Sequence, residues 1–439
     1  MLKTLVGAFK NKDIRKKILY TLMILVIVRV GSLLPIPGVD TEYFSSLLSG
    51  INTGDLSYLS AFTGGSFERM SLFALSITPY ITSSIIMQFL AIAIPKLEEM
   101  QKEGEDGRKK IAAITRYVTI ALALIESIAM AVGFGRSGLI KGYQGFSTLH
   151  YIVSIIVVVA ALTAGSAMLM WLGERITENG VGNGISIVLL INIISGMPSD
   201  FATLYSTFVA PRTIAKGVLA AAIIIAILVV MVVLVCFLQD GERRIPVQYS
   251  QKVSGRKTFG GQSTNIPLKV NTAGVMPVIF ASSLMQSPVI IAQLFGKSYE
   301  WTRYLSSSYW CRISAPKYSI GLILYIVLLI IFAYFYTSIT FNPIEVADNL
   351  KKAGGVIPGI TPGKSTSDYL NNILNYIVFV GAVGLLIIAL IPIMCTGFFN
   401  ASVSFGGTSV IIIVGVVLET LKQIESQMVN RYYKGFLSE

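Results

Sequence analysis

Long apolar runs constrain this chain more than any other feature of its sequence. Crossing a bilayer as a helix takes about 20 mostly apolar residues. Ten stretches fit that template: 18–34, 72–94, 112–134, 150–172, 183–200, 216–238, 271–295, 318–341, 370–394 and 407–428. Hydrophobic residues make up 54% of the chain and charged residues only 13%, against about 25% charged in soluble domains. The sequence therefore predicts an all-α polytopic membrane protein with ten transmembrane helices.

Lysine and arginine are unevenly distributed between the two sides of the membrane. If all ten stretches span, the basic tail 1–17 and the loops 239–270 and 342–369 fall on one side. Cytoplasmic segments carry the excess of Lys and Arg in membrane proteins. We therefore expect both termini, including a tail at 429–439, to be cytosolic.

The two long polar loops, 239–270 and 342–369, exceed what a simple connection needs. Both are basic, and the second contains the Pro- and Gly-rich run 357–363. Long loops are often functional, and basic side chains suit an acidic or phosphorylated partner. The alternative is that these charges only anchor the loops in the cytosol.

Enzyme and cofactor chemistry find no support in the sequence. Gly363-Lys364-Ser365 superficially resembles a phosphate-binding loop, but the glycine required five residues earlier is Pro358. One histidine and three scattered cysteines provide no metal site or disulfide framework. We expect a protein that is not an enzyme and has no cofactor or metal.

A few charges and helix breakers interrupt the apolar runs. Glu126 lies near the middle of its span, where a carboxylate marks either a functional site or a buried structural hydrogen bond. Arg29, Arg116 and Lys422 are expected to extend toward the membrane interfaces, with Glu419 available to pair with Lys422. Pro277 and Pro288 are expected to kink the span 271–295 twice.

Four segments carry a more specific signal. They are FALSITPYITSSIIMQFL at 73–90, GERITENGVGNGISI at 173–187, QSTNIPLKVNTAGVMPVIFASS at 262–283 and FNPIEVADNLKKAGGVIPGITPG at 341–363. In this order they resemble the second span, the start of the fifth, the entry and core of the seventh, and the large cytoplasmic loop of the SecY family. That family forms the channel subunit of the general protein-secretion translocon.

The resemblance implies an architecture. It predicts two inverted five-helix halves, 18–200 and 201–428, with an hourglass pore between them. A short plug helix would follow the first span at about 58–70, including Phe62, Gly64, Gly65 and Phe67. Inverted halves of five spans agree with the even total count.

The resemblance also assigns positions around the pore. A ring of aliphatic side chains would close the waist: Ile81, Ile85, Ile185, Leu189, Ile279 and Ile412. A lateral gate between spans two and seven would include Gln88, Glu126, Pro277, Ser282 and Ser283. An isoleucine in a membrane helix usually faces lipid or packs in a core, so only the match to the family motifs singles these residues out.

Partners are implied by the same resemblance. Docking to the SecA motor ATPase or to the ribosome would use basic loop residues: Arg243, Arg244, Lys252, Arg256, Lys257, Lys351, Lys352 and Lys364. The family often has an arginine where this chain has Thr361, which leaves the role of that position open. SecE and SecG subunits, nascent chains with signal sequences and the lipid bilayer complete the expected set.

The expected function is therefore a protein-conducting channel in the bacterial cytoplasmic membrane. It would translocate unfolded secretory polypeptides and release transmembrane segments sideways into lipid. The alternative is a secondary transporter built from inverted repeats, which would need a polar midplane site. A structural scaffold would leave the long basic loops unexplained.

Overall fold

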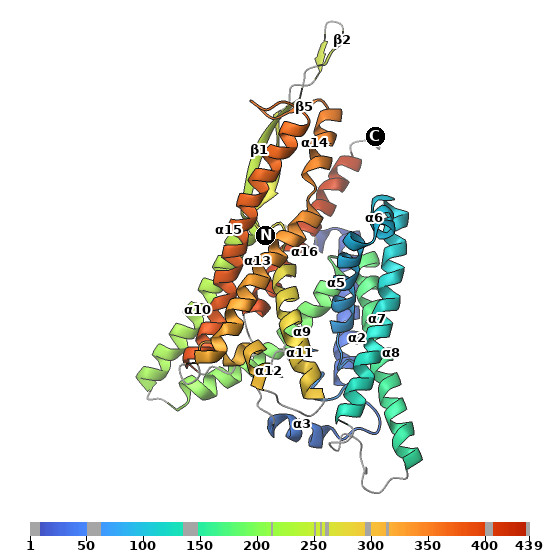
Figure 1. Ribbon diagram of the computed structural model, residues 1–439, viewed down its shortest axis with the longest axis vertical. Coiled ribbons are helices and arrows are strands. Elements are labelled where there is room, and N and C mark those ends of the chain that lie inside the picture. Colours follow the sequence, from blue (N-terminus) through green and yellow to red (C-terminus); the bar gives the residue numbers. More distant parts are fainter. Residues whose placement is uncertain are drawn as a thin grey trace.

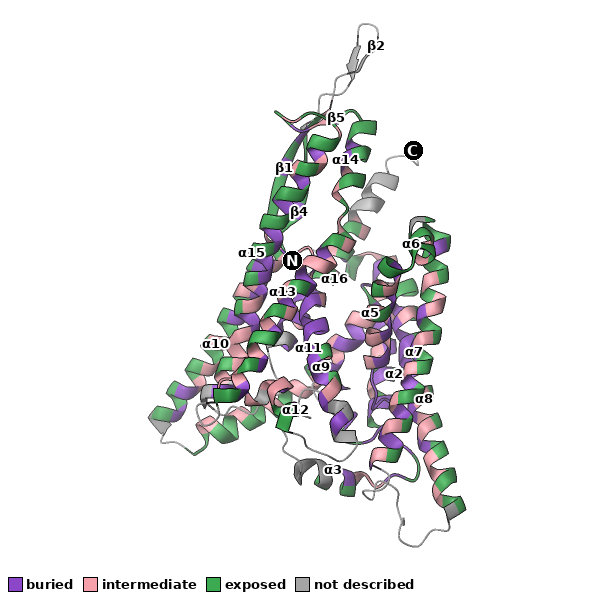
Figure 2. Ribbon diagram, in the orientation of Figure 1, coloured by how far each residue is buried: buried purple, intermediate pink, exposed green. Residues whose placement is uncertain are grey.

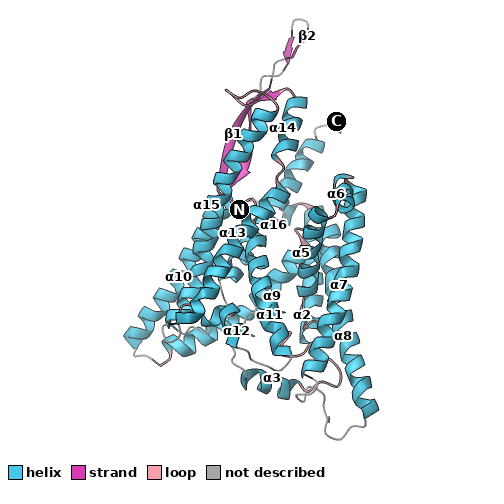
Figure 3. Ribbon diagram, viewed as in Figure 1, coloured by secondary structure: helices cyan, strands magenta, loops and turns pink. Residues whose placement is uncertain are grey.

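The structure is a computed structural model. It describes residues 9–50, 63–134, 148–211, 214–249, 252–254, 257–259, 263–294, 300–312, 316–399 and 407–435. Helices make up most of these residues and run roughly along one long direction, with strands confined to one end (Figures 1 and 3).

Each predicted span contains a helix. These helices are α2 (Lys12–Leu33), α5 (Thr78–Ala93), α7 (Glu105–Phe134), α8 (Thr148–Asn179), α9 (Gly184–Leu204), α10 (Ile214–Asp240), α11 (Met276–Leu294), α13 (Ile320–Thr340), α15 (Lys364–Phe399) and α16 (Gly407–Gly435). Six helices of the described chain are each long and apolar enough to cross a membrane unaided, and a bent pair, α5 with α6 (Pro95–Lys102), adds a seventh candidate. The prediction of a helical multi-pass membrane protein is confirmed.

Outward-facing residues of the helices are exposed (Figure 2), and many of them are large and apolar. On α10, for example, the exposed side chains include Val218, Leu219, Ile225 and Val229. Such a surface is unfavourable in water, but it costs little against acyl chains. The helix faces therefore suit a lipid environment.

The second span starts later than predicted, because residues 71–77 form turns and α5 begins only at Thr78. These turns are buried, and glycines on the surrounding helices make room for them. An added Cβ at Gly31 of α2 would overlap the ring of Phe73, and one at Gly165 of α8 would lie 1.9 Å from the Leu72 carbonyl oxygen. Non-helical backbone is tolerated in a membrane protein where protein surrounds it.

The fifth span is longer than the predicted 183–200. Helix α9 runs from Gly184 to Leu204 and continues as a π-helical turn, Tyr205–Val209. Its start is fixed by the glycine-rich motif. The Asn183 side chain accepts from the backbone N–H groups of Ile185 and Ser186, and a Cβ at Gly184 would lie 1.9 Å from the Gly173 carbonyl oxygen of α8.

The seventh span is not kinked at Pro277, which was predicted to break it. Helix α11 begins at Met276, so Pro277 lies in the first turn, where a missing N–H costs nothing. Residues before it form a turn closed by the Asn271 side chain, which donates to the Gly274 carbonyl at 2.9 Å. Only Pro288 lies inside the helix.

The two predicted cytoplasmic loops contain short strands, although the chain as a whole is mostly helical, as predicted. Strand β1 (Glu242–Tyr249) pairs antiparallel with β4 (Ser263–Lys269) and with β5 (Gly355–Val356). Short strands β2 (Lys252–Ser254) and β3 (Lys257–Phe259) form a hairpin between β1 and β4, and α14 (Pro343–Lys352) precedes β5. One apolar cluster, including Ile245, Val247, Leu350 and Ile357, joins both loops to α15.

The first and last helices meet near the ends of the chain. Ile14 of α2, Val181 of the α8–α9 turn and Ile424 of α16 form one buried cluster. Lys17 Nζ donates to Gln427 Oε1 at 3.3 Å, across 410 residues of sequence. The start of α2 and the end of α16 therefore lie on the same side of the helical bundle.

The small remaining helices lie at both ends of the bundle. Helix α3 (Thr41–Gly50) and helix α12 (Glu300–Leu305) lie at the end opposite the sheet (Figure 1). Two 3-10 turns, Ser307–Tyr309 and Pro316–Ser319, connect α12 to α13.

A glycine-to-alanine pair tests the packing around the buried turns. We expect Gly165→Ala to destabilise the protein by about 1–3 kcal/mol, because its methyl group overlaps a backbone oxygen that cannot rotate away. Gly196→Ala on α9 is the control, since a Cβ there meets nothing within 4 Å. Thermal unfolding in detergent measures both, and equal melting temperatures for the two variants would contradict the packing described.

Candidate functional site

The six predicted waist residues all belong to the main apolar core of the structure, which also runs through α2, α8, α10, α13 and α15. Leu189, Ile279 and Ile412 are buried in it. Ile81, Ile85 and Ile185 are half-buried and pack against it. The cluster thus joins α5 and α9 of the predicted N-terminal half to α11 and α16 of the predicted C-terminal half.

Helical periodicity explains why four of these side chains lie in two pairs. Ile81 and Ile85 are four residues apart on α5, as are Ile185 and Leu189 on α9, so each pair shares one helical face. Buried turns before α5 place Ile81 in the first turn of that helix. An aliphatic collar offers no ligand to an ion, dewets when empty and can deform around a passing side chain.

The described part of the predicted plug, 63–70, approaches α9 at Gly64 but is not a regular helix. From Gly64 to Met70 the chain forms turns, with positive φ at Gly64, Gly65 and Met70. A Cβ at Gly64 would lie 2.8 Å from the Asn192 carbonyl oxygen and 2.6 Å from Ser195 Oγ, both on α9. This part of the plug therefore touches the helix that carries Ile185 and Leu189.

Two further contacts hold the predicted plug. Phe67 is buried and makes edge contacts with Phe44 of α3 and Phe134 of α7. Arg29 Nη1 donates to the Gly64 carbonyl at 3.4 Å, so Arg29 turns inward rather than extending to the interface as predicted. Phe62 lies outside the described residues.

The predicted polar gate is less connected than expected. Ser282 is buried and Ser283 half-buried on α11, and Gln88 and Glu126 are half-buried on α5 and α7. Within the described part of the chain, Glu126 makes no hydrogen bond or ion pair, and the Oε1 atom of Gln88 is buried without a partner. The structure therefore does not join these four residues by direct polar contacts.

Beside the predicted gate lies a row of aromatic rings that sequence analysis did not identify, here called the aromatic seam: Phe89, Phe280, Phe332 and Phe335. The ring of Phe89 on α5 stacks on Phe335 of α13, with centroids 4.5 Å apart, and meets Phe332 at 6.3 Å. Phe280 of α11 contacts Phe332 at 5.9 Å. Phe89 lies four residues after Ile85, which places it on the same helical face and could have identified it.

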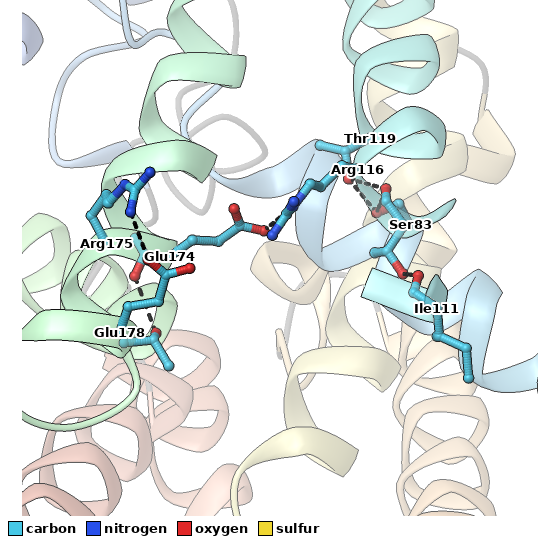
Figure 4. Close-up of polar contacts among 10 residues, drawn as sticks. Ser83, Ile111, Arg116, Thr119, Glu174, Arg175 and Glu178 are labelled. Atoms are coloured by element: carbon cyan, nitrogen blue, oxygen red, sulfur yellow. Dashed lines mark hydrogen bonds and ion pairs between the residues drawn. The ribbon is translucent and has the colours of Figure 1, made fainter. Parts of the chain in front are cut away.

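Polar contacts tie the predicted N-terminal half together (Figure 4). Arg116 of α7 forms an ion pair with Glu174 of α8 at 2.7 Å, where we expected it only to extend to the interface. The hydroxyl groups of Ser83 on α5 and Thr119 on α7 are 2.5 Å apart and buried. Together these contacts join α5, α7 and α8 into one unit.

A second ion pair corrects another sequence expectation. Lys422 of α16 pairs with Asp240 of α10 at 2.8 Å rather than with Glu419. It joins the end of α10, where the first long loop begins, to the last helix.

The predicted docking residues lie at the sheet end. Arg243 and Arg244 are exposed on β1, Lys351 and Lys352 are exposed in the last turn of α14, and Lys364 is exposed at the start of α15. Lys252 and Lys257 belong to the β2–β3 hairpin, and Arg256 lies outside the described residues. Because β1 pairs with β5, the two basic loops form one platform.

Among the described residues, no group of three or more His, Cys, Asp or Glu side chains could hold a metal ion. The site described above therefore consists of an apolar waist, an aromatic seam beside it, a buried turn against α9 and a basic platform at one end.

Comparison with known proteins identifies this arrangement. A family model described as SecY matches residues 71–421. The protein translocase subunit SecY of Streptomyces galbus is 44% identical over 446 aligned residues, covering 100% of both chains. The subunit of the same name from Bacillus subtilis is 42% identical over 445 residues, again covering 100% of both.

Solved structures share the fold. One, described as a protein conducting channel, superposes with a TM-score of 0.61 at 18% identity, covering 94% of this chain and 93% of that one. Sec61 in the canine ribosome-channel complex gives a TM-score of 0.59 at 17% identity, covering 94% and 93%. At such low identity these likenesses show the fold. With the family model and the full-length relatives, they show that the chain belongs to the SecY family.

Proposed function

We propose that the chain forms a protein-conducting channel that passes unfolded secretory polypeptides across a membrane and releases transmembrane segments sideways into lipid. The observation that carries this proposal is the apolar waist. Six aliphatic side chains from α5, α9, α11 and α16 belong to one apolar core that spans the two halves predicted from sequence. Membership of the SecY family supports the same function.

An apolar waist favours a polypeptide channel over a transporter. A secondary transporter needs convergent polar or charged groups near the membrane midplane to bind its substrate and coupling ion. The six waist residues here are all isoleucine or leucine. Such a ring discriminates poorly between side chains, which suits a pore that must accept any unfolded sequence.

The plug and the seam give the closed channel two seals. The turn at Gly64 closes on α9, and Phe89 closes the gap between α5 and α13. A hydrophobic signal sequence would replace the aromatic contacts of the seam, and the polar residues Gln88, Glu126, Ser282 and Ser283, with Pro277 at the start of α11, would line the opened gate.

The basic platform suits docking at the cytosolic side. Arg243, Arg244, Lys351, Lys352 and Lys364 are solvent-exposed, so they can reach the acidic surface of a motor ATPase such as SecA or the phosphates of ribosomal RNA. This orientation places both termini in the cytosol of a bacterium, with the chain in the cytoplasmic membrane beside SecE and SecG. The chain itself would not be an enzyme, and the motor or the ribosome would supply the energy.

Crosslinking tests the waist. After Cys236, Cys311 and Cys395 are replaced by serine, single cysteines at Ile85, Leu189 and Ile279 should crosslink to a stalled secretory chain, because that chain must pass between them. A cysteine at Val229, which is 55% exposed on the outer face of α10, is the control. Crosslinks at Val229 alone would overturn the pore assignment.

Two neighbouring glycines test the plug. Gly64 and Gly65 both have positive φ, 63° and 79°, so alanine at either costs about 1–2 kcal/mol of backbone strain. Only at Gly64 does the new Cβ also collide with α9, whereas at Gly65 it meets nothing within 4 Å. We expect Gly64→Ala to raise the ion conductance of the idle channel in planar bilayers more than Gly65→Ala does. Equal conductance would mean that contact with α9 does not seal the pore.

Replacing the aromatic seam should relax the demand for a strong signal sequence. An aromatic pair contributes about 0.5–1.5 kcal/mol, so Phe89→Ala should increase export of a reporter with a weakened signal sequence about two- to tenfold. Ile92→Ala, one turn further along α5 at a 54% exposed position, is the control. Equal export by both variants would remove Phe89 from the gate.

A further inference from the structure

Three cations lie in and just after α12, a helix at the end of the bundle opposite the sheet (Figure 1). Residues 300–319 contain Arg303, Arg312 and Lys317 but only one acidic residue, Glu300. In the proposed orientation this is the outer side of the membrane, where Lys and Arg are normally scarce. Their concentration there is not explained by the channel function.

The cations are arranged around two tyrosines. The guanidinium of Arg312 lies 5.1 Å from the ring centre of Tyr309, and that of Arg303 lies 5.8 Å from the same ring. Lys317 Nζ lies 4.9 Å from the ring centre of Tyr318. The two tyrosine rings are 6.0 Å apart, so one aromatic pair holds all three charges by cation–π contact.

This segment is fixed by packing against α13 and α15. Trp310 is buried, and its Nε1 donates to the Tyr304 carbonyl at 2.8 Å. Gly321 lets that carbonyl lie directly on α13, and Gly397 of α15 lies against Cys311. Cys311 has a φ of 58°, an unfavourable value for a residue with a side chain. Such a conformation persists only where the surroundings enforce it.

Stacking leaves hydrogen-bond donors of Arg312 available. A ring covers the face of a guanidinium, while its N–H groups point outward in the plane. The Nε atom of Arg312 is buried and has no hydrogen-bond partner among the described residues. Lys317 approaches Glu300 only at 3.7 Å, with both side chains exposed, so one carboxylate faces three cations.

The surface beside the cations is apolar. Ile320, Ile323 and Leu324 at the start of α13 are exposed, as is Trp301 on α12. Tryptophan and tyrosine gather at the level of lipid headgroups, and an exposed aliphatic helix face suits the acyl chains next to them.

We propose that Arg303, Arg312 and Lys317 bind the phosphate headgroup of an anionic phospholipid, whose acyl chains lie along the first turns of α13. Arginine is well suited to this role because its donors match phosphate geometry. The assignment to the outer leaflet rests on the proposed orientation, but lipid binding itself does not.

Native mass spectrometry of the purified protein in detergent tests the proposal, with phosphatidylglycerol and phosphatidylcholine added in turn. We expect retained phosphatidylglycerol but not phosphatidylcholine. Arg312→Gln should weaken retention about tenfold, the scale of one charge-assisted hydrogen bond. Lys216→Gln, an exposed cation at the start of α10 on the same side, should change nothing. The proposal would be overturned if the unaltered chain retained both lipids equally. It would also be overturned if Arg312→Gln retained as much phosphatidylglycerol as the unaltered chain.

Two further arms separate the remaining explanations. If millimolar inorganic phosphate displaces phosphatidylglycerol completely, the site binds free phosphate and the lipid assignment is wrong. Arg303 is exposed, so Arg303→Gln offers a second variant should Arg312→Gln fail to fold, and it must also reduce retention. None of these measurements depends on polypeptide transport, so the lipid site and the channel function can fail independently.

Discussion

Burial of the non-helical stretch 64–77 determines how the surrounding helices pack. Lipid offers no hydrogen bonds, so such backbone must be enclosed by protein. Here it bonds to its own turns and to the end of α2, as where the N–H of Leu72 donates to the Leu34 carbonyl at 2.9 Å. Helices α2 and α8 approach this stretch closely through Gly31 and Gly165. The stretch itself approaches α9 through Gly64. Larger residues there would push apart the helices that hold the waist.

The waist and the seam follow from that arrangement. Because the chain becomes helical only at Thr78, the face of α5 that carries Ile81, Ile85 and Phe89 is presented toward α11 and α13. At the waist and the seam, the two halves contact each other through aliphatic and aromatic side chains. Apolar contacts have little directionality, so a passing polypeptide can replace them one after another without any fixed hydrogen bond having to be broken.

Hydrophobic runs predicted where the helices lie, since a span must be apolar whatever its neighbours are. They could not show that 71–77 is unwound, because a buried turn is as apolar as a helix. Pro277 was misread for a related reason, since only the structure shows that α11 starts beside it. The sheet was hidden because β1 is short and has Pro246 between the apolar residues Ile245 and Val247. Its partner β5 lies about a hundred residues away. The waist positions came from family resemblance, since a single isoleucine does not reveal what it faces.

The contact between Ile14 and Ile424 has a consequence for biosynthesis. Lys17 and Gln427 are 410 residues apart, so at about 5–20 residues per second their partners emerge about 20–80 s apart. Throughout that interval α2 lacks the neighbour that covers its first turn. This clasp between the chain ends is therefore among the last contacts to form, and it can close only when both halves have been inserted. A chain that stops short of α16 stays open at this point, which gives quality-control proteases a structural difference to recognise.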